Sequence, residues 1–191
     1  IVGSMHVYGE PEYLPMDEPH PLHGKGIYVA SRLEQEQVSE TYIDRLPIVV
    51  TRSFNHTGTG QPDTFVIPKI VKQIIEIKQG KRAKLELGNI NVKRDISDVR
   101  DVARAYRLLL EQEKRGLTVN VCRGESISLK NVLEHVKVLA GLSELGIEVK
   151  DALLRPHDVL DVYGDHRLLT RLTGWQPEIG HDEMLRDLYD Y

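Results

Sequence analysis

Apolar residues along this chain follow two patterns, one typical of buried strands and the other of amphipathic helices. Residues 47–52 and 117–122 are short apolar runs rich in β-branched side chains, and they predict buried strands, the first of them parallel to its neighbours. The apolar positions of 65–79 recur at helical spacing, and Gly80 ends that segment. Residues 84–87 alternate between apolar and polar, which predicts a short strand.

Capping residues predict where the later helices begin. Asp98 follows an extended segment at 92–96 and precedes a predicted helix at 99–112, and Ser128 precedes the next helix. The last predicted elements are a final strand at Ile147 and Val149 and two short helices opened by Asp165 and by His181-Asp182. Strands therefore alternate with helices through most of the chain, which indicates an α/β fold.

The amino-terminal part of the chain lacks these helical and strand patterns. Residues 5–25 contain four prolines, which preclude long regular structure and predict a loop. The loop leads into a predicted helix that carries Tyr28 and runs to about Asp44.

Composition narrows the class of protein. The chain has 191 residues, 40% of them hydrophobic and 28% charged, which is ordinary for a soluble globular protein. The net charge of −4 gives no electrostatic argument for binding nucleic acid or a membrane, and no apolar run is long enough to span a bilayer. The single cysteine, Cys122, excludes an internal disulfide and favours a reducing compartment, so we expect a cytoplasmic protein. His20 and His23 lack the further ligands that a metal site needs, so no metal is expected.

Candidate chemistry begins with Tyr28 and Arg32, which lie four residues apart on one helix and therefore share a face. A fixed positive charge beside a phenol lowers the pKa of the phenol, because the charge favours the phenolate. Tyr28 is therefore a candidate proton donor or acceptor near neutral pH. The alternative is a solvated pair on a helix surface.

Upstream residues add a resemblance to a known family. Ser4 ends an apolar lead-in and stands four residues before the pair Tyr8-Gly9. Together with Tyr28 this arrangement resembles the active site of the extended short-chain dehydrogenase/reductases, the NAD-dependent epimerase/dehydratase family. The resemblance implies that Tyr28 donates a proton, that Ser4 polarises a carbonyl oxygen, and that Tyr28 and Arg32 contact NADP or NAD.

Two positions depart from that family. Arg32 replaces the lysine that hydrogen-bonds the nicotinamide ribose, and arginine has a different donor geometry and cannot relay protons. Both altered activity and loss of activity therefore remain open. His6 stands where the related dehydratases carry an acid/base glutamate. Histidine can titrate, but dehydration is not the expected reaction, and a surface histidine without a role is an equal alternative.

The most specific run is Arg52-Ser53-Phe54-Asn55-His56-Thr57-Gly58-Thr59-Gly60-Gln61. It resembles a segment of the GDP-6-deoxy-4-keto-D-mannose reductases of that family, with Ser53 and Thr59 replacing two prolines. The resemblance implies that the substrate-binding residues are Asn55, Arg94, Arg155 and Asp158. A turn-forming role for Asn55 and an ion pair of Arg94 with Asp95 or Asp98 are the alternatives.

These observations lead to one overall interpretation. Residues 1–54 are expected to be the remaining strands and helices of a Rossmann-type domain, and residues 55–191 mainly a sugar-nucleotide-binding domain with segments returning to the sheet. Because the chain has no Gly-x-Gly-x-x-Gly turn, the resemblance implies that a nucleotide-binding half precedes it in a longer protein.

The expected activity is reduction of the 4-keto group of GDP-4-keto-6-deoxymannose to GDP-D-rhamnose. The alternatives are a GDP-mannose 4,6-dehydratase, another nucleotide-sugar epimerase or dehydratase, and a non-catalytic sugar-nucleotide-binding homologue. A homodimer through the helix that bears Tyr28 is possible, although Glu34, Glu36 and Glu40 are expected to make its outer face acidic.

Overall fold

The structure is a computed structural model that describes residues 1–150, 153 and 159–191. Two of the predicted substrate-binding residues, Arg155 and Asp158, lie outside the described residues. Helices alternate with strands, so the predicted α/β class is confirmed. The chain forms two compact units: unit 1 comprises residues 1–56, 95–126 and 162–178, and unit 2 comprises 57–94, 127–161 and 179–191. Within the described residues, every helix is too short or too polar to span a bilayer.

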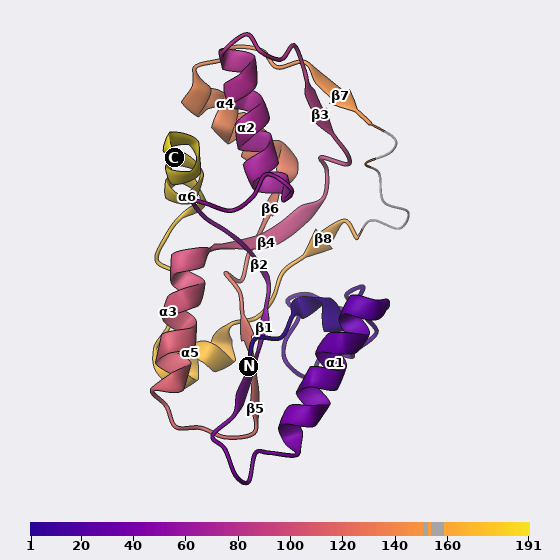
Figure 1. Cartoon of the computed structure of the whole chain (residues 1–191), viewed down its shortest axis with the longest axis vertical. Coiled ribbons are helices and arrows are strands. Elements are labelled where there is room, and N and C mark those ends of the chain that lie inside the picture. Colours follow the sequence, from indigo (N-terminus) through magenta and orange to yellow (C-terminus); the bar gives the residue numbers. More distant parts are fainter. Residues whose placement is uncertain (151–152, 154–158) are drawn as a thin grey trace. The chain divides into compact units, whose positions relative to one another are not determined.

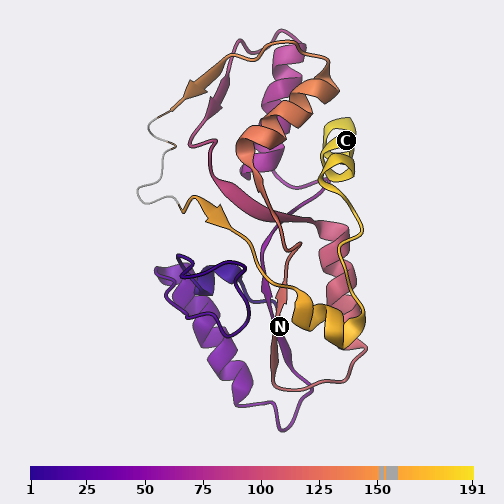
Figure 2. The same ribbon diagram turned by 180° about the vertical axis from the view of Figure 1, so that it is seen from behind.

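A pair of parallel strands forms the centre of unit 1. Strand β1 (Val49–Ser53) pairs in register with β5 (Leu117–Val121), so that Val49 lies opposite Leu117. An isolated parallel bridge joins Val2 to Thr51 of β1. Helix α1 (Ile27–Glu40) lies on one side of these strands, and α3 (Val99–Leu110) and α5 (Arg167–Thr173) lie on the other (Figure 1; Figure 2). Unit 1 is thus a short parallel sheet covered by helices on both faces.

The main apolar core of unit 1 lies between the sheet and helices α3 and α5. Its members are buried aliphatic side chains and one tryptophan: Val102, Ala105, Leu109, Val119, Val121, Leu169 and Trp175. The indole N–H of Trp175 donates to the carbonyl of Asp101 over 3.0 Å, and its ring is fully buried. Trp175 is therefore a core residue.

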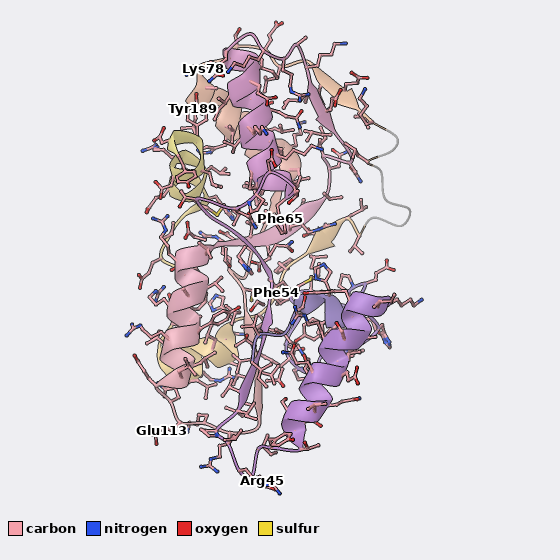
Figure 3. The ribbon with its side chains drawn as sticks, in the orientation of Figure 1. Arg45, Phe54, Phe65, Lys78, Glu113 and Tyr189 are labelled. Carbon is pink, nitrogen blue, oxygen red and sulfur yellow. The ribbon has the colours of Figure 1, made fainter. Side chains whose placement is uncertain are left out.

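Unit 2 is built from three helices that pack on one another. These are α2 (Val66–Lys78), α4 (Leu129–Ala140) and α6 (His181–Asp190). The short strands β3 (Leu85–Leu87) and β7 (Ile147–Val149) pair in parallel, and β3 packs against α2. The ammonium group of Lys78 donates to the Tyr189 hydroxyl over 2.9 Å, which joins the end of α2 to α6 (Figure 3).

The remaining elements are short. A 3₁₀ helix, η1 (Met5–Val7), follows Ser4. A further sheet has the order β2 (Asn55–Thr57), β4 (Lys93–Asp98), β6 (Ser126–Ser128), with β8 (Asp161–Val162) beside β4.

The structure corrects two sequence predictions. A strand follows the one at Ile147 and Val149, which was predicted to be the last, and α1 ends at Glu40 rather than near Asp44. Strands β2, β6 and β8 were not predicted because each has at most one apolar side chain, so the sequence shows no alternation there.

Candidate active site

Ser4 is fixed at the start of η1, directly after the chain leaves the edge of β1. The backbone N–H of Gly3 donates to the Thr51 carbonyl over 2.7 Å, and a Cβ at position 3 would lie 2.9 Å from that oxygen. Ser4 is extended and buried, and its Oγ accepts from the backbone N–H of His6 over 3.3 Å. The same Oγ lies 3.0 Å from His6 Nδ1. The serine hydroxyl is therefore held in one position by the backbone.

Tyr28 lies in the first turn of α1, beside the His6 ring that follows Ser4. Its side chain is 51% exposed, and the His6 ring meets it edge-on with the ring centroids 5.9 Å apart. The pKa of Tyr28 lies below its ordinary value, chiefly because Ser4 hydrogen-bonds its oxygen. Partial burial opposes this lowering, and the nearby Arg32 guanidinium adds to it. Serine, histidine, tyrosine and arginine thus converge in unit 1.

Arg32 sits over the tyrosine ring, with its Cζ 5.1 Å from the ring centroid. Its Nη1 donates to the Val2 carbonyl over 3.3 Å and to Gln35 Oε1 over 3.0 Å. Its Nε is buried and has no hydrogen-bond partner in the part of the chain that the structure describes. A buried N–H without a partner is costly, so this part of the guanidinium is held in place at the expense of a hydrogen bond.

A buried ion pair supports the segment that carries Ser4. The Arg52 guanidinium in β1 donates two hydrogen bonds, 3.1 and 2.8 Å long, to the Glu36 carboxylate of α1. Both side chains are buried. Arg52 also lies 5.0 Å from the ring centroid of Tyr8, whose hydroxyl donates to Asn120 Oδ1 over 2.7 Å. Burial raises the pKa of Tyr8 to about 12, so this tyrosine stays neutral and has a packing role.

This pair corrects the prediction that Glu36 belongs to an acidic outer face of α1. Glu36 points inward because Arg52 is buried in β1 and needs a buried counter-charge. In the sequence, the position of Arg52 at the end of an apolar, β-branched run was the feature that could have indicated a buried charge in need of a partner. Sequence reasoning therefore missed Arg52, Glu36 and Asn120 as supporting residues.

The predicted substrate-binding residues lie in both units. Asn55 begins β2, belongs to unit 1 and is exposed. Arg94 belongs to unit 2, and its Nη1 donates to the carbonyls of Lys93 and Val159, each over 2.7 Å.

Asp95 and Asp98, which follow Arg94 in the sequence, both accept hydrogen bonds from backbone N–H groups. Asp98 caps α3 by accepting from the Arg100 N–H over 2.8 Å, as predicted. Asp95 accepts from three backbone N–H groups, those of Arg123, Gly124 and Gly164, over 2.8, 2.9 and 3.2 Å. Burial still raises the pKa of Asp95 to about 6, against the effect of those donors.

The two histidines His20 and His23 contact other residues of the amino-terminal loop, and Cys122 is buried. His20 accepts from the Glu12 N–H over 3.0 Å, and His23 lies 2.7 Å from the Glu12 carboxylate. No group of three potential metal ligands occurs among residues 1–150, 153 and 159–191. Cys122 is fully buried, and burial raises the pKa of its thiol well above the usual value, so it packs as an inert apolar residue.

Comparison with known proteins places this arrangement in a family. The sequence model of GDP-mannose 4,6 dehydratase matches residues 1–188. The chain belongs to the GDP-mannose 4,6 dehydratase family. This family lies within the epimerase/dehydratase group that the serine and tyrosine motifs resemble, so the resemblance seen in the sequence is confirmed.

Individual members of the GDP-mannose 4,6 dehydratase family and its relatives are similar over the whole chain. GDP-6-deoxy-D-mannose reductase of Pseudomonas aeruginosa is 35% identical over 192 residues, which cover 97% of this chain and 62% of the relative. GDP-mannose 4,6 dehydratase 1 of Arabidopsis thaliana is 29% identical, over 98% of this chain and 52% of the relative. The chain thus spans roughly half to three fifths of the length of these relatives.

Solved structures agree with the fold. RMD from Pseudomonas aeruginosa, complexed with NADPH, superimposes with a TM-score of 0.93 and 35% identity, covering 99% of this chain and 64% of that one. The dTDP-glucose 4,6-dehydratase of Bacillus anthracis, in complex with NAD, has a TM-score of 0.85 at 23% identity, covering 99% and 59%. The second likeness supports the Rossmann-type fold alone.

Proposed function

We propose that this chain carries the catalytic part of an NAD(P)-dependent sugar-nucleotide reductase, which reduces the 4-keto group of GDP-4-keto-6-deoxymannose to GDP-D-rhamnose. The observation that carries the proposal is the Ser4–Tyr28–Arg32 arrangement, in which Arg32 lies 5.1 Å from the ring centroid of Tyr28, and Ser4 and Arg32 together hold the pKa of Tyr28 below its ordinary value. Similarity to the reductase of Pseudomonas aeruginosa supports this choice of substrate.

Each residue of the arrangement has a separate role in the proposed reduction. Tyr28, with its lowered pKa, donates a proton to the oxygen of the substrate carbonyl. The Ser4 hydroxyl, held by the backbone, stabilises the charge that develops on that oxygen. Arg32 keeps a fixed positive charge beside the phenol and is proposed to contact the cofactor in place of the family's lysine. NADPH or NADH, when bound, would supply the hydride.

The sugar nucleotide is proposed to lie against four residues expected from the sequence: Asn55, Arg94, Arg155 and Asp158. A carboxamide suits hydroxyl or phosphate oxygens, and an arginine fork suits a diphosphate because it donates two parallel hydrogen bonds. Arg94 Nη1 donates to two backbone carbonyls, and these hydrogen bonds orient the guanidinium.

Dehydration is the second enzyme reaction to weigh, since the family takes its name from it. We place it behind reduction because position 6 carries histidine, where the related dehydratases are expected to carry a glutamate. A binding homologue without catalysis is the candidate of a different class, and the exchange of lysine for Arg32 is the feature that favours it.

The test is NADPH oxidation by the intact protein with GDP-4-keto-6-deoxymannose, followed by absorbance. We expect consumption of NADPH that Tyr28→Phe abolishes. Formation of the 4-keto sugar from GDP-mannose would instead identify a dehydratase. No turnover with either substrate, while GDP still raises the melting temperature, would overturn the enzyme proposal in favour of a binding homologue.

A homodimer through α1 is also proposed. Its exposed face retains Glu34 and Glu40, but Val38 of α1 and Tyr42 just after the helix are 53% and 44% exposed and line a hollow of about 530 Å³. Turning Glu36 inward makes this face less acidic than the sequence predicted. Light scattering on the intact protein would decide: a monomer at micromolar concentration contradicts the proposal.

A further inference from the structure

The hydroxyl of Ser4 has to present its hydrogen to a substrate oxygen if it is to stabilise charge there. A serine hydroxyl rotates about its Cβ–Oγ bond, and it has one hydrogen to donate and two lone pairs that accept. Unless other groups fix this rotation, the hydrogen turns toward any nearby acceptor. A donor that already points at the developing charge needs no reorganisation during the reaction, so whatever fixes the Ser4 hydroxyl affects the rate.

His6 approaches the Ser4 hydroxyl with two different groups. Its backbone N–H donates to Ser4 Oγ over 3.3 Å, and its ring Nδ1 lies 3.0 Å from the same oxygen. The ring contact has an ordinary hydrogen-bond length, and the backbone contact is slightly longer. Ser4 is buried, which limits competition from water for its hydroxyl. One residue therefore supplies two of the partners of this oxygen.

The position of the proton on the His6 ring determines what the ring contact does. If Nδ1 carries no proton, its lone pair accepts the Ser4 hydrogen, and the hydroxyl is not available to a substrate. If Nδ1 carries a proton, the ring donates to Ser4 Oγ. Both lone pairs of that oxygen are then filled by donors from His6, and the hydroxyl hydrogen is left to point in a third direction. Only this second arrangement makes the hydroxyl a fixed donor.

The surroundings of His6 restrict where its ring can lie. Met5 and Val7 on either side of it are buried, and the Val7 carbonyl accepts from the Gly24 N–H over 3.0 Å. The Tyr28 ring meets the His6 ring edge-on, with the ring centroids 5.9 Å apart. The histidine ring therefore contacts both of the side chains that are proposed to act on the substrate carbonyl.

We propose that His6 is a positioning residue: its ring, protonated at Nδ1, directs the hydrogen of the Ser4 hydroxyl toward the substrate carbonyl. The inference rests on the proposed reductase function, in which Ser4 stabilises the charge on that oxygen. The histidine transfers no proton, because its Nδ1–H bond stays intact throughout the reaction. This role differs from the acid/base role of the glutamate that the related dehydratases are expected to carry at position 6.

The tautomer of His6 can be measured without turnover. The ring ¹⁵N chemical shifts of the intact protein distinguish a proton on Nδ1 from one on Nε2, and the signals of His6 are those that disappear in His6→Asn. At a pH where the ring is neutral we expect the Nδ1–H form. Ser4→Ala should shift the population toward the Nε2–H form, because it removes the acceptor of the Nδ1 proton. A neutral His6 protonated at Nε2 in the parent would overturn the proposal.

Two variants of position 6 separate the donor from the packing of the ring, with kcat for NADPH oxidation by the intact protein as the readout and GDP-4-keto-6-deoxymannose as the substrate. His6→Leu removes the donor and should lower kcat about tenfold with KM nearly unchanged, which is part of the roughly 10²–10³ that loss of a whole oxyanion donor costs. His6→Asn has the same branching as leucine, and its amide N–H can replace the Nδ1–H, so it should recover most of that turnover. An asparagine variant no faster than the leucine variant would contradict the role of the donor and overturn the proposal.

A double variant tests whether His6 acts through Ser4. Ser4→Ala removes the hydroxyl, so adding His6→Leu to it should lower kcat no further, whereas additive losses would overturn the proposal. His23→Leu, at an exposed histidine of the same loop that contacts Glu12, is the matched control and should behave as the parent. If the parent has no Tyr28-dependent turnover, the proposed function fails, and the role assigned to His6 fails with it, whichever tautomer is found.

Discussion

The ion pair between Glu36 and Arg52 yields the prediction with the best-defined magnitude. Only 8% of the arginine side chain and 10% of the glutamate side chain are exposed, and the two guanidinium–carboxylate hydrogen bonds are 3.1 and 2.8 Å long. Glu36→Gln keeps the shape of the side chain but removes the negative charge. It leaves a buried guanidinium without its counter-charge, which costs about 3 kcal/mol of unfolding free energy at the lower end of measured cases.

The free energy of unfolding follows from urea denaturation of the intact protein, and the melting temperature provides a second reading. For a chain of this size, about 3 kcal/mol corresponds to a melting temperature lowered by roughly 6–12 °C. The control is Glu111→Gln, which breaks an exposed pair of 2.9 Å between Arg107 of α3 and Glu111, the residue that follows the helix. Such surface pairs contribute about 0.3–0.5 kcal/mol, so this variant should be nearly unchanged.

The double variant Glu36→Leu/Arg52→Met separates the charge effect from packing. If the cost comes from an unpaired buried charge, removing both charges should restore most of the stability lost in Glu36→Gln. A Glu36→Gln variant within about 0.5 kcal/mol of the parent, matching the surface control, would refute the reasoning. The pair would then be only a packing contact between α1 and β1.

Three further predictions concern the site and its supports. Arg32→Lys should change kcat of the proposed reductase by tenfold or more, measured by NADPH oxidation, because lysine places its charge and donors differently; an unchanged kcat would mean that the cation has no role in turnover. Burial raises the pKa of Asp95 to about 6, above its unfolded value, so its folded form binds a proton more readily and stability should fall as the pH rises from about 4 to 6. Asp95→Asn should remove that slope in urea denaturation at several pH values; an identical slope would assign it to other groups. Gly24→Ala should reduce activity strongly, because a Cβ there would lie 2.2 Å from the His6 carbonyl oxygen, whereas Gly180→Ala, with open space around it, should keep full activity.

Much of the fold could be predicted because local patterns report local structure. The helical spacing of 65–79 and the capping residue Ser128 correctly predicted α2 and the start of α4. The apolar run at 117–122 correctly predicted β5. These features depend on residues a few positions apart, where periodicity and capping act directly.

The candidate site was predictable only in part. The spacing of Tyr28 and Arg32 placed the two on one helix face, and the structure has the guanidinium over the ring. The hydrogen bond between Ser4 and His6 could not be predicted, because it depends on the 3₁₀ turn that Ser4 opens. Roles in turnover stay predictions until the proposed assays are done.

The sequence by itself determined the order and type of the longer elements and the residues that resemble a reductase site. Only the tertiary structure decided which way Glu36 points and which side chains meet Ser4 and Tyr8. The physical reason is sequence distance: Glu36 and Arg52 are 16 residues apart, and Tyr8 and Asn120 are 112 apart. Hydrophobic patterning says that a position is buried, but the identity of a buried polar partner depends on how helices and strands pack together.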